Sequence, residues 1–181
     1  MNRIDSKARA AVISALVEGC SIRSTVRLTG VSKPTVLKLL VDAGRVAVAF
    51  QDSIFRNLPC QKLQVDEMWA FIGAKQRNVT PEMAQRNPAA GDIWLWVAID
   101  ADTKLVPTWM LGQRDWHTAQ TFVRDLAARL ANRVQLASDG LKLYFHAVKA
   151  TFANNIDFAM LRKIYAGSVD DSGTTMRYSS P

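Results

Sequence analysis

The stretch QVDEMWAFI, residues 64–72, is an apolar, strand-like run that carries two adjacent carboxylates, Asp66 and Glu67, in its first half. Burying a carboxylate costs several kcal/mol unless it is paired, hydrogen-bonded or bound to a metal, so an acid in such a run needs a reason. A further acid, Asp139, ends another apolar run, residues 134–138, and Gly140 follows it directly. Two acids on neighbouring strands of one sheet could hold divalent metal ions between them.

The composition is that of a globular protein with an uneven basic charge. The chain has 181 residues, 49% of them hydrophobic, which is enough for one ordinary domain or for a small domain and a larger one. Residues 1–45 contain eight basic and three acidic side chains, a net +5, out of a total of +7. A basic surface favours a polyanionic partner, and here that surface is predicted at the N-terminus.

Cysteine and histidine are too few and too far apart for a zinc ribbon or a disulfide framework. The chain has only Cys20, Cys60, His117 and His146, with no CxxC motif, which is typical of a reducing compartment. The N-terminus lacks a signal-peptide apolar region, and no apolar run approaches the roughly 18 residues that a membrane-spanning helix needs. The sequence therefore predicts a cytoplasmic protein that is neither exported nor membrane-spanning.

Residues 1–58 are predicted to form an all-helical DNA-binding domain. Apolar residues recur at helical spacing from residue 4 to 16, a short helix follows between Ser21 and Gly30, and a third opens with Ser32 as N-cap and Pro34 in its first turn. A connecting helix is predicted over residues 45–58 and ends before Pro59. The expected buried side chains of the two middle helices are Ile22, Val26, Leu28, Val36, Leu39 and Leu40.

The segment 21–40 therefore has the layout of a helix-turn-helix, whose second helix enters the major groove of DNA. Five side chains are predicted to contact DNA. Arg23 and Arg27 lie on the outer side of the first of these helices, and Lys33, Thr35 and Lys38 would reach the DNA from the second. A plain three-helix bundle with a solvated charged face is the alternative interpretation.

After residue 60 the period of the pattern changes from that of a helix to that of a strand. Strands are predicted at 63–72, 93–99, 105–111, 134–138 and 156–158, helices at 117–132 and 141–152, and polar loop at 74–91. This order predicts a mixed sheet with crossover helices, the topology of ribonuclease H-like folds. We thus expect a domain over residues 59–165 and a loop-like tail over 166–181.

Three motifs in this order resemble the transposases of the insertion-sequence-one family, within the DDE transposase and retroviral integrase superfamily. The first is Asp66-Glu67-Met68-Trp69 with the following Gly73-Ala74-Lys75-Gln76, the second is the hairpin at 98–104, and the third is Ser138-Asp139-Gly140 with Tyr144. The resemblance covers nearly the whole chain, including the helix-turn-helix turn Gly30-Val31-Ser32.

The resemblance implies an α+β fold: an all-α helix-turn-helix followed by a ribonuclease H-like domain. It also implies that Asp66 and Asp139 are catalytic acids and ligands of Mg²⁺ or Mn²⁺, because in-line phosphoryl transfer uses two cations held by carboxylates. The third acid of this family is a glutamate on a later helix, and it cannot be placed, since glutamate occurs only at positions 18, 67 and 82. The catalytic domain is therefore expected to be incomplete and to lack its last helices, which leaves the enzymatic activity of this chain open.

Other acids of the chain are less suitable as metal ligands. Glu67 could replace Asp66, but a strand sends adjacent side chains to opposite faces, and the resemblance selects Asp66. Asp100 and Asp102 stand in a hairpin where they are expected to form the turn. Asp157, Asp170 and Asp171 follow Asp139 but lie in the wrong context for the missing glutamate.

Three functions remain open on the sequence. The first is a bacterial, nucleoid-associated transposase that binds the inverted repeats at the ends of its element as a homo-oligomer on double-stranded DNA and carries out Mg²⁺-dependent strand cleavage and transfer. The second is a non-catalytic DNA-binding regulator that represses transposition. The third is a ribonuclease H-type nuclease, against which the helix-turn-helix argues, because a nuclease that reads hybrid shape needs no sequence reader.

Overall fold

The computed structural model describes residues 4–161, and the chain divides after Phe55 into two compact units, residues 1–55 and 56–181. The predicted tail 166–181 lies outside the described residues. No helix in the described part is both long and apolar enough to cross a membrane.

The first unit consists of three helices, α1 (Ser6–Val17), α2 (Ile22–Thr29) and α3 (Lys33–Ile54). Asp5 caps α1 by accepting a hydrogen bond from the Ala8 amide at 2.7 Å, and Gly30 ends α2 in the left-handed conformation, with φ of 69°. The predicted third and connecting helices are one continuous helix. Gly44 is the only helix-breaking residue between them, and its cost of about 1 kcal/mol is too small to end a helix of this length.

The core of the first unit is formed by Val12, Val31 and Val36, with Ile22, Val26 and Leu39 among the residues packed around them. Two expected core residues are exposed instead, Leu28 and Leu40. Leu28 is two positions after the core residue Val26, about 200° around the helix, and therefore lies on the far side of α2. Leu40 lies at the edge of the surface that α1 and α2 cover. Two helices joined by a short turn at residues 30–32 are present, as predicted for this part of the chain.

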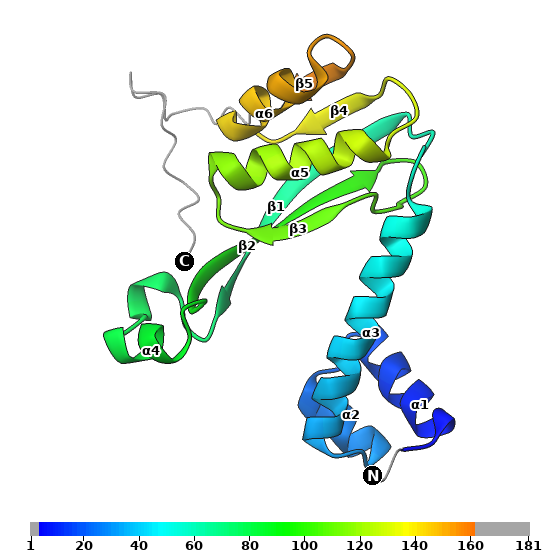
Figure 1. Cartoon of the computed structure of the whole chain (residues 1–181), viewed down its shortest axis with the longest axis vertical. Helices are drawn as coiled ribbons and strands as arrows, with labels where there is room; N and C mark the ends of the chain where they lie inside the picture. Colours follow the sequence, from blue (N-terminus) through cyan, green and yellow to red (C-terminus); the bar gives the residue numbers. More distant parts are fainter. Residues whose placement is uncertain (1–3, 162–181) are drawn as a thin grey trace, which may run out of the picture. The chain divides into compact units, whose positions relative to one another are not determined.

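The second unit is built on a five-stranded mixed sheet (Figure 1). Its strands are β1 (Lys62–Ile72), β2 (Gly91–Asp100), β3 (Trp109–Gly112), β4 (Gln135–Ser138) and β5 (Asp157–Met160), in the spatial order β3-β2-β1-β4-β5. The first three are antiparallel neighbours, whereas β4 is parallel to β1 and β5 is parallel to β4. This mixed sheet after N-terminal helices confirms the predicted α+β class and is consistent with a ribonuclease H-like domain.

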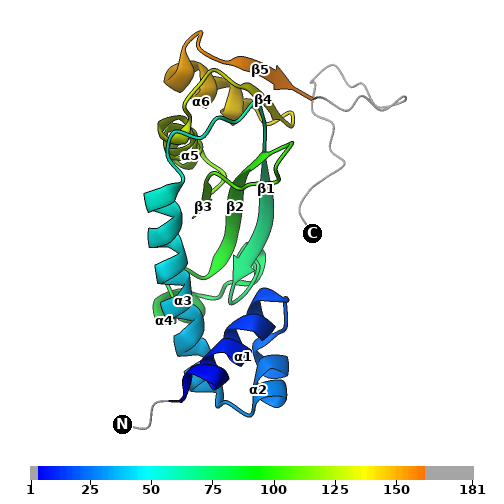
Figure 2. The same cartoon turned by 90° about the vertical axis from the view of Figure 1, so that its right-hand side faces the viewer.

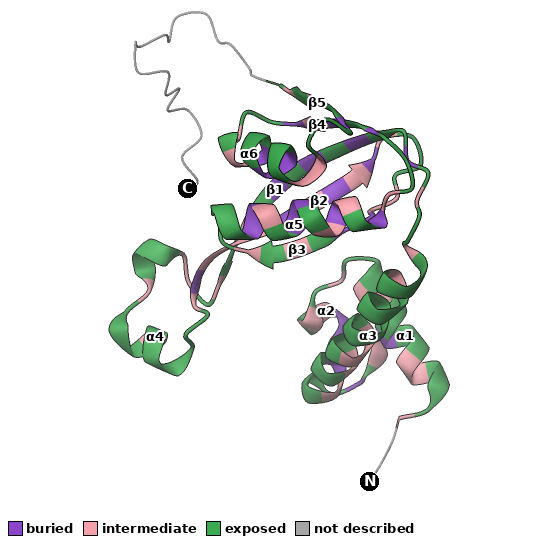
Figure 3. Cartoon of the chain, turned by 45° about the horizontal axis from the view of Figure 1, so that its top comes forward, coloured by how far each residue is buried: buried purple, intermediate pink, exposed green. Residues whose placement is uncertain are grey.

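Two helices, α5 (Trp116–Arg129) and α6 (Lys142–Phe152), pack against the same face of this sheet. Alternate strand residues supply that face: Leu63 and Val65 from β1, Trp96 from β2 and Leu136 from β4 are all buried against the helices. The buried residues are purple in Figure 3, where they line the contact between α5, α6 and the strands. On β1 the intervening residues, including Asp66 and Met68, are exposed on the other face.

The remaining differences from the prediction lie in the connections. The expected loop 74–91 contains a 3₁₀ turn, η1 (Gln76–Asn78), and a short helix, α4 (Pro81–Arg86), which Thr80 caps through the Met83 amide. The strand expected from residue 105 begins only at Trp109, because Pro107 has no amide hydrogen to donate to a ladder. Figure 2 shows β1 and β2 side by side as a long hairpin that carries this insertion at its tip.

Candidate functional site

The parallel pairing of β1 with β4 places Asp66 next to Asp139. The last pair in the register is Val65 with Ser138, so the residue that follows on each strand is one of the two acids. Parallel strands lie about 4.8 Å apart, which sets the spacing of the two backbones at this point. Asp139 is the first residue after β4, and Asp66 lies in the middle of β1. The sheet thus brings together the two acids that the sequence singled out.

Each of these carboxylates is exposed and uses one oxygen in a local hydrogen bond. Asp66 Oδ1 accepts from the Glu67 amide at 2.8 Å, and Asp139 Oδ1 accepts from the Leu141 amide at 3.0 Å. Within residues 4–161 neither Oδ2 atom has a hydrogen-bond partner, so each acid keeps an oxygen available to a ligand. Carboxylate oxygens are the donors that Mg²⁺ and Mn²⁺ prefer, and the pair therefore fits such an ion.

The acids form a pair and not a larger cluster. In the described part of the chain, no group of three or more His, Cys, Asp or Glu side chains is arranged to hold a metal ion. A cation at Asp66 and Asp139 would have to complete its octahedral shell with water or with oxygens from a bound molecule.

Glu67 occupies the opposite face of β1, as the alternation of a strand requires. Its side chain is 2% exposed and forms an ion pair with Arg114, whose Nε and Nη2 atoms lie 2.7 and 2.6 Å from Oε1. The Arg114 guanidinium also stacks over the Trp94 ring, 4.8 Å from its centroid. Glu67 therefore already has a cationic partner on the helix-covered face, away from the exposed side of Asp66.

Tyr144 of α6 lies in the core behind the two acids. It is fully buried and meets Trp96 edge-on, with ring centroids 5.4 Å apart. Among the described residues, neither the Tyr144 hydroxyl nor the Oε2 atom of Glu67 has a hydrogen-bond partner. The two groups nevertheless interact electrostatically. Burial is the main reason that the pKa of Tyr144 lies far above its usual value, and the charges of Glu67, Asp139 and Asp66 raise that pKa further.

Negative charge therefore accumulates around the middle of β1. Burial raises the pKa of Glu67, Arg114 opposes that rise, and the nearby Asp139 carboxylate adds to it. Like charges this close favour a bound cation, which would lower the repulsion among them. Arg114 is a residue that sequence analysis missed. It is 47 positions from Glu67 and stands in the loop before α5, so no local pattern pointed to it.

The other acids have different roles in the structure. Asp100 forms the hairpin turn, as expected, because its Oδ1 accepts hydrogen bonds from the amides of Asp102 and Thr103 at 2.9 and 2.8 Å. These bonds lower the pKa of Asp100. Asp157 is paired with Arg133 at 2.6 Å at the start of β5. Asp170 and Asp171 lie outside the described residues.

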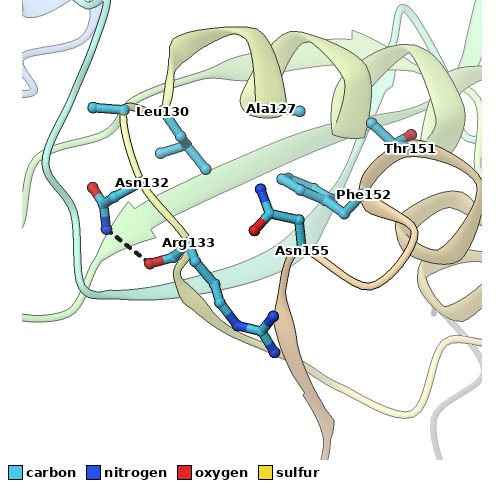
Figure 4. Close-up of a pocket in the computed structure, with 8 residues that line it drawn as sticks. Ala127, Leu130, Asn132, Arg133, Thr151, Phe152 and Asn155 are labelled. Carbon is cyan, nitrogen blue, oxygen red and sulfur yellow. Dashed lines mark hydrogen bonds between the residues drawn. The ribbon is translucent and has the colours of Figure 1, made fainter.

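A pocket lies between the C-terminal ends of α5 and α6 (Figure 4). Arg133, which precedes β4, lines it together with Phe152 and Asn155. The pocket is therefore at the opposite end of β4 from Asp139. Arg133 donates a hydrogen bond of 2.7 Å to the Asn154 carbonyl and forms an ion pair with Asp157, so its guanidinium already has partners within the fold.

The side chains predicted to contact DNA are mostly exposed on the first unit. Arg23 and Arg27 lie on α2, and Lys33 and Lys38 lie on α3. Thr35 is half-buried, and its hydroxyl forms a hydrogen bond of 3.0 Å with the hydroxyl of Ser32. Ser32 consequently occupies the N-cap position of α3 without capping a backbone amide through its side chain.

Asp42 is the acid in this region that sequence analysis left without a role. It pairs with Lys38 at 2.6 Å, and this pairing is the main reason that the pKa of Asp42 is lowered. The spacing of four residues on a helix could have predicted the pair. Both side chains are largely exposed, so the pair is weak and Lys38 can exchange partners.

No family model and no curated protein matches the chain. Among solved structures, it is similar to the simian T-cell lymphotropic virus intasome in complex with PP2A regulatory subunit B56 gamma, with 14% identity and a TM-score of 0.40 over 86% of this chain and 52% of that chain. It is also similar to the piggyBac transposase synaptic complex with hairpin DNA, with 14% identity and a TM-score of 0.41 over 97% of this chain and 34% of that chain. The chain thus spans about half of the first and a third of the second. Likeness of this degree does not by itself assign a function.

The Glu67–Arg114 pair predicts unequal effects of removing its two members. Arg114→Ala leaves a buried carboxylate without its cation and should lower the free energy of unfolding by about 2–4 kcal/mol at neutral pH. Glu67→Gln leaves a half-exposed guanidinium that water can solvate, and it should cost about 1 kcal/mol. Urea unfolding of both variants beside the unmodified chain measures the difference.

The pH dependence of the Arg114→Ala variant provides the control. Without Arg114 the pKa of Glu67 is raised further, so the native state binds its proton more tightly than the unfolded state. The loss of stability should then be greatest at neutral pH and shrink as the pH falls through the raised pKa toward the ordinary glutamate value. Equal losses for the two variants at neutral pH would contradict the assignment of Glu67 as a buried charge held by Arg114.

Proposed function

We propose that this chain is a DNA-binding protein of the DDE transposase type, which binds the inverted-repeat ends of a mobile element in the nucleoid of a bacterial cell. The helix-turn-helix would recognise the duplex, and Asp66 and Asp139 would hold divalent cations for phosphoryl transfer on DNA. The observation that carries this proposal is the β1–β4 register, which makes the two acids neighbours on adjacent strands.

The chemistry of the acid pair supports a cation site. When bound, Mg²⁺ or Mn²⁺ activates an attacking oxygen and stabilises the leaving oxygen of a phosphodiester. Asp66 and Asp139 would each contribute the oxygen that is not engaged in a local hydrogen bond. Glu67 and Tyr144 lie behind them in the core, where the Glu67 carboxylate adds negative charge and neither side chain is an exposed ligand. Two carboxylates give a weak site, and we propose that this chain alone does not cleave DNA.

The cation site predicts a measurable loss of Mn²⁺ binding. Asp66→Asn and Asp139→Asn should each abolish the binding, because a single carboxylate anchors the ion too weakly. Electron paramagnetic resonance of free Mn²⁺ during a titration measures the bound fraction. Asp102→Asn, which removes another exposed acid from the hairpin turn, is the matched control and should leave the binding unchanged. Unchanged binding in both site variants would refute the site.

The helix-turn-helix supplies the DNA contacts in this proposal. Arg23 and Arg27 would contact phosphates from α2, while Lys33, Thr35 and Lys38 would reach base edges from the first turns of α3. In the free protein Lys38 is paired with Asp42, and binding would require it to exchange this acid for the DNA. By the same resemblance to transposases, we propose that the protein acts on DNA as a homo-oligomer.

The assigned contacts predict two classes of effect on DNA binding. Arg23→Ala and Arg27→Ala should weaken binding to element-end and random duplexes alike and reduce the salt dependence, because a phosphate contact releases counterions. Lys33→Ala and Lys38→Ala should weaken binding to the element end more, by about 1–3 kcal/mol for a lost base contact. Fluorescence anisotropy at several salt concentrations separates the two classes.

Two further variants of the same region act as controls. Asp42→Asn should strengthen DNA binding, because it removes the acid that competes for Lys38. Lys7→Ala removes one exposed charge from α1 and should change both affinities only slightly. Uniform losses from all four contact variants would remove the assignment of α3 as the recognition helix.

A second function, the non-catalytic regulator, is favoured by one feature of the structure. Among the described residues, no third acidic side chain joins Asp66 and Asp139 in a group that could hold a metal ion. A strand-cleavage assay on element-end DNA with Mn²⁺ distinguishes the two. Nicking that Asp139→Asn abolishes would establish catalysis by this chain, and binding without nicking would favour the regulator.

A further inference from the structure

The hairpin of β1 and β2 continues beyond the part of the sheet that α5 covers, toward α4 (Figure 1). Along one face of β1 the side chains become steadily more exposed: Glu67 is buried, Trp69 is half-buried and Phe71 is 48% exposed. Trp94 of β2 lies directly opposite Trp69 in the register. Residues directly opposite each other in antiparallel strands share a face, so this part of the hairpin carries three aromatic rings on one side.

Two of these three rings are covered by a cation. The Lys75 ammonium lies 5.1 Å from the centroid of the Trp69 ring, and the Arg114 guanidinium lies 4.8 Å from that of Trp94. Phe71 packs at a tilt beside Trp69, with the ring centroids 5.7 Å apart, and no cation of the described residues lies over it. Phe71 therefore presents an open aromatic face close to an ammonium group.

The loop that follows β1 is fixed next to these rings. The Gln76 amide donates a hydrogen bond of 2.9 Å to Oδ1 of Asp92, which is the cross-strand partner of Phe71. Gly91 has a φ of 127°, and the Gln76 side chain fills the space where a Cβ would stand. These contacts hold the neighbouring Lys75 beside the aromatic rings before any ligand is present, and such preorganisation lowers the cost of binding.

The tip of the hairpin has an excess of positive charge. Residues 73–90 contain three basic side chains, Lys75, Arg77 and Arg86, against one acid, Glu82. Arg77 and Arg86 are exposed, and neither forms an ion pair with another described residue. Cations interspersed with an open aromatic ring match a nucleic acid strand, whose phosphates and bases alternate in the same way. An apolar protein partner would leave these charges unpaired.

The open face of Phe71 selects an unpaired strand over a duplex. In a duplex each base is stacked between its neighbours and presents only its edges in the grooves. A base can lie flat on the Phe71 ring only after it has left that stack, and every unpaired base has a π-face that can do so.

We propose that Trp69, Phe71, Lys75 and Arg77 form a surface, here called the hairpin-tip surface, that binds single-stranded DNA. An unpaired base stacks on the Phe71 ring beside Trp69, and Lys75 and Arg77 contact the flanking phosphates. The choice of DNA rests on the proposed function, to which this surface adds a contact with an unpaired strand. Neither the acid pair nor a bound metal is needed for it.

Fluorescence anisotropy of the full chain with a labelled oligothymidine, in the absence of divalent metal, tests the hairpin-tip surface. Phe71→Ala should raise the dissociation constant for this single strand about tenfold, because one base loses its stacking partner. Phe71→Trp keeps an aromatic ring and should bind like the unmodified chain. Phe145→Ala removes an equally exposed phenylalanine from α6 and should leave the affinity unchanged. Circular dichroism checks that the variants keep their fold.

An abasic oligonucleotide of the same length separates stacking from charge. It keeps the phosphates and lacks the bases, so the unmodified chain should bind it more weakly than oligothymidine, and Phe71→Ala should cause no further loss. Arg77→Ala should weaken binding to both strands by a similar factor and lower the salt dependence, because a phosphate contact releases counterions.

The outcomes separate this surface from the rest of the proposed function. Unchanged oligothymidine binding by Phe71→Ala, or an equal loss on the abasic strand, would overturn it. An equal loss on duplex DNA would overturn it as well, because Phe71 would then act through the fold. Single-strand binding that depends on Phe71, beside duplex binding that none of the α2 and α3 variants alters, would support this surface and contradict only the helix-turn-helix assignment.

Discussion

The structure of the second unit depends on the parallel pairing of β1 with β4. Four residue pairs, from Lys62 with Gln135 to Val65 with Ser138, fix this register. A slip of one residue would turn every β1 side chain to the other face, which would expose Leu63 and Val65 and bury Asp66. The apolar core and the position of the acids are therefore set by one constraint. The same packing of Leu63 and Val65 against α5 and α6 that stabilises the sheet also keeps Asp66 beside Asp139.

The charges at this end of the sheet are divided between two environments. On the exposed face Asp66 and Asp139 are the acids of the proposed cation site. On the covered face Glu67 is held by Arg114, with Tyr144 and Trp96 packed behind it. In the proposal, a single strand thus carries one acid for a ligand and one for the fold. This division gives a physical reason for two adjacent carboxylates in an otherwise apolar strand.

The sequence predicted much of this arrangement, because its signals are local. The strand period of β1 and β2, the turn chemistry of Asp100 and the glycine that ends α2 each depend on a few neighbouring residues. The features that the sequence did not predict depend on partners that are distant in the chain, or on the balance between the helix propensities of neighbouring residues. The pairing of Arg114 with Glu67 spans 47 positions. The continuity of α3 past Gly44 reflects a helix whose total stability exceeds the cost of one glycine. The sequence predicted which residues form the candidate site. That Asp66 and Asp139 are neighbours follows only from the pairing register of β1 with β4, which the sequence does not specify.

In the proposed site, the β1–β4 register brings two strands together around one cation. Paramagnetic broadening of assigned amide resonances by substoichiometric Mn²⁺ is the sharpest test of this arrangement, since the broadening falls steeply with distance from the ion. The amides at 65–67 and at 139–141 should broaden together and before any others. Broadening confined to one of the two strands, or centred on the hairpin turn at Asp100 or on Asp157, would contradict it.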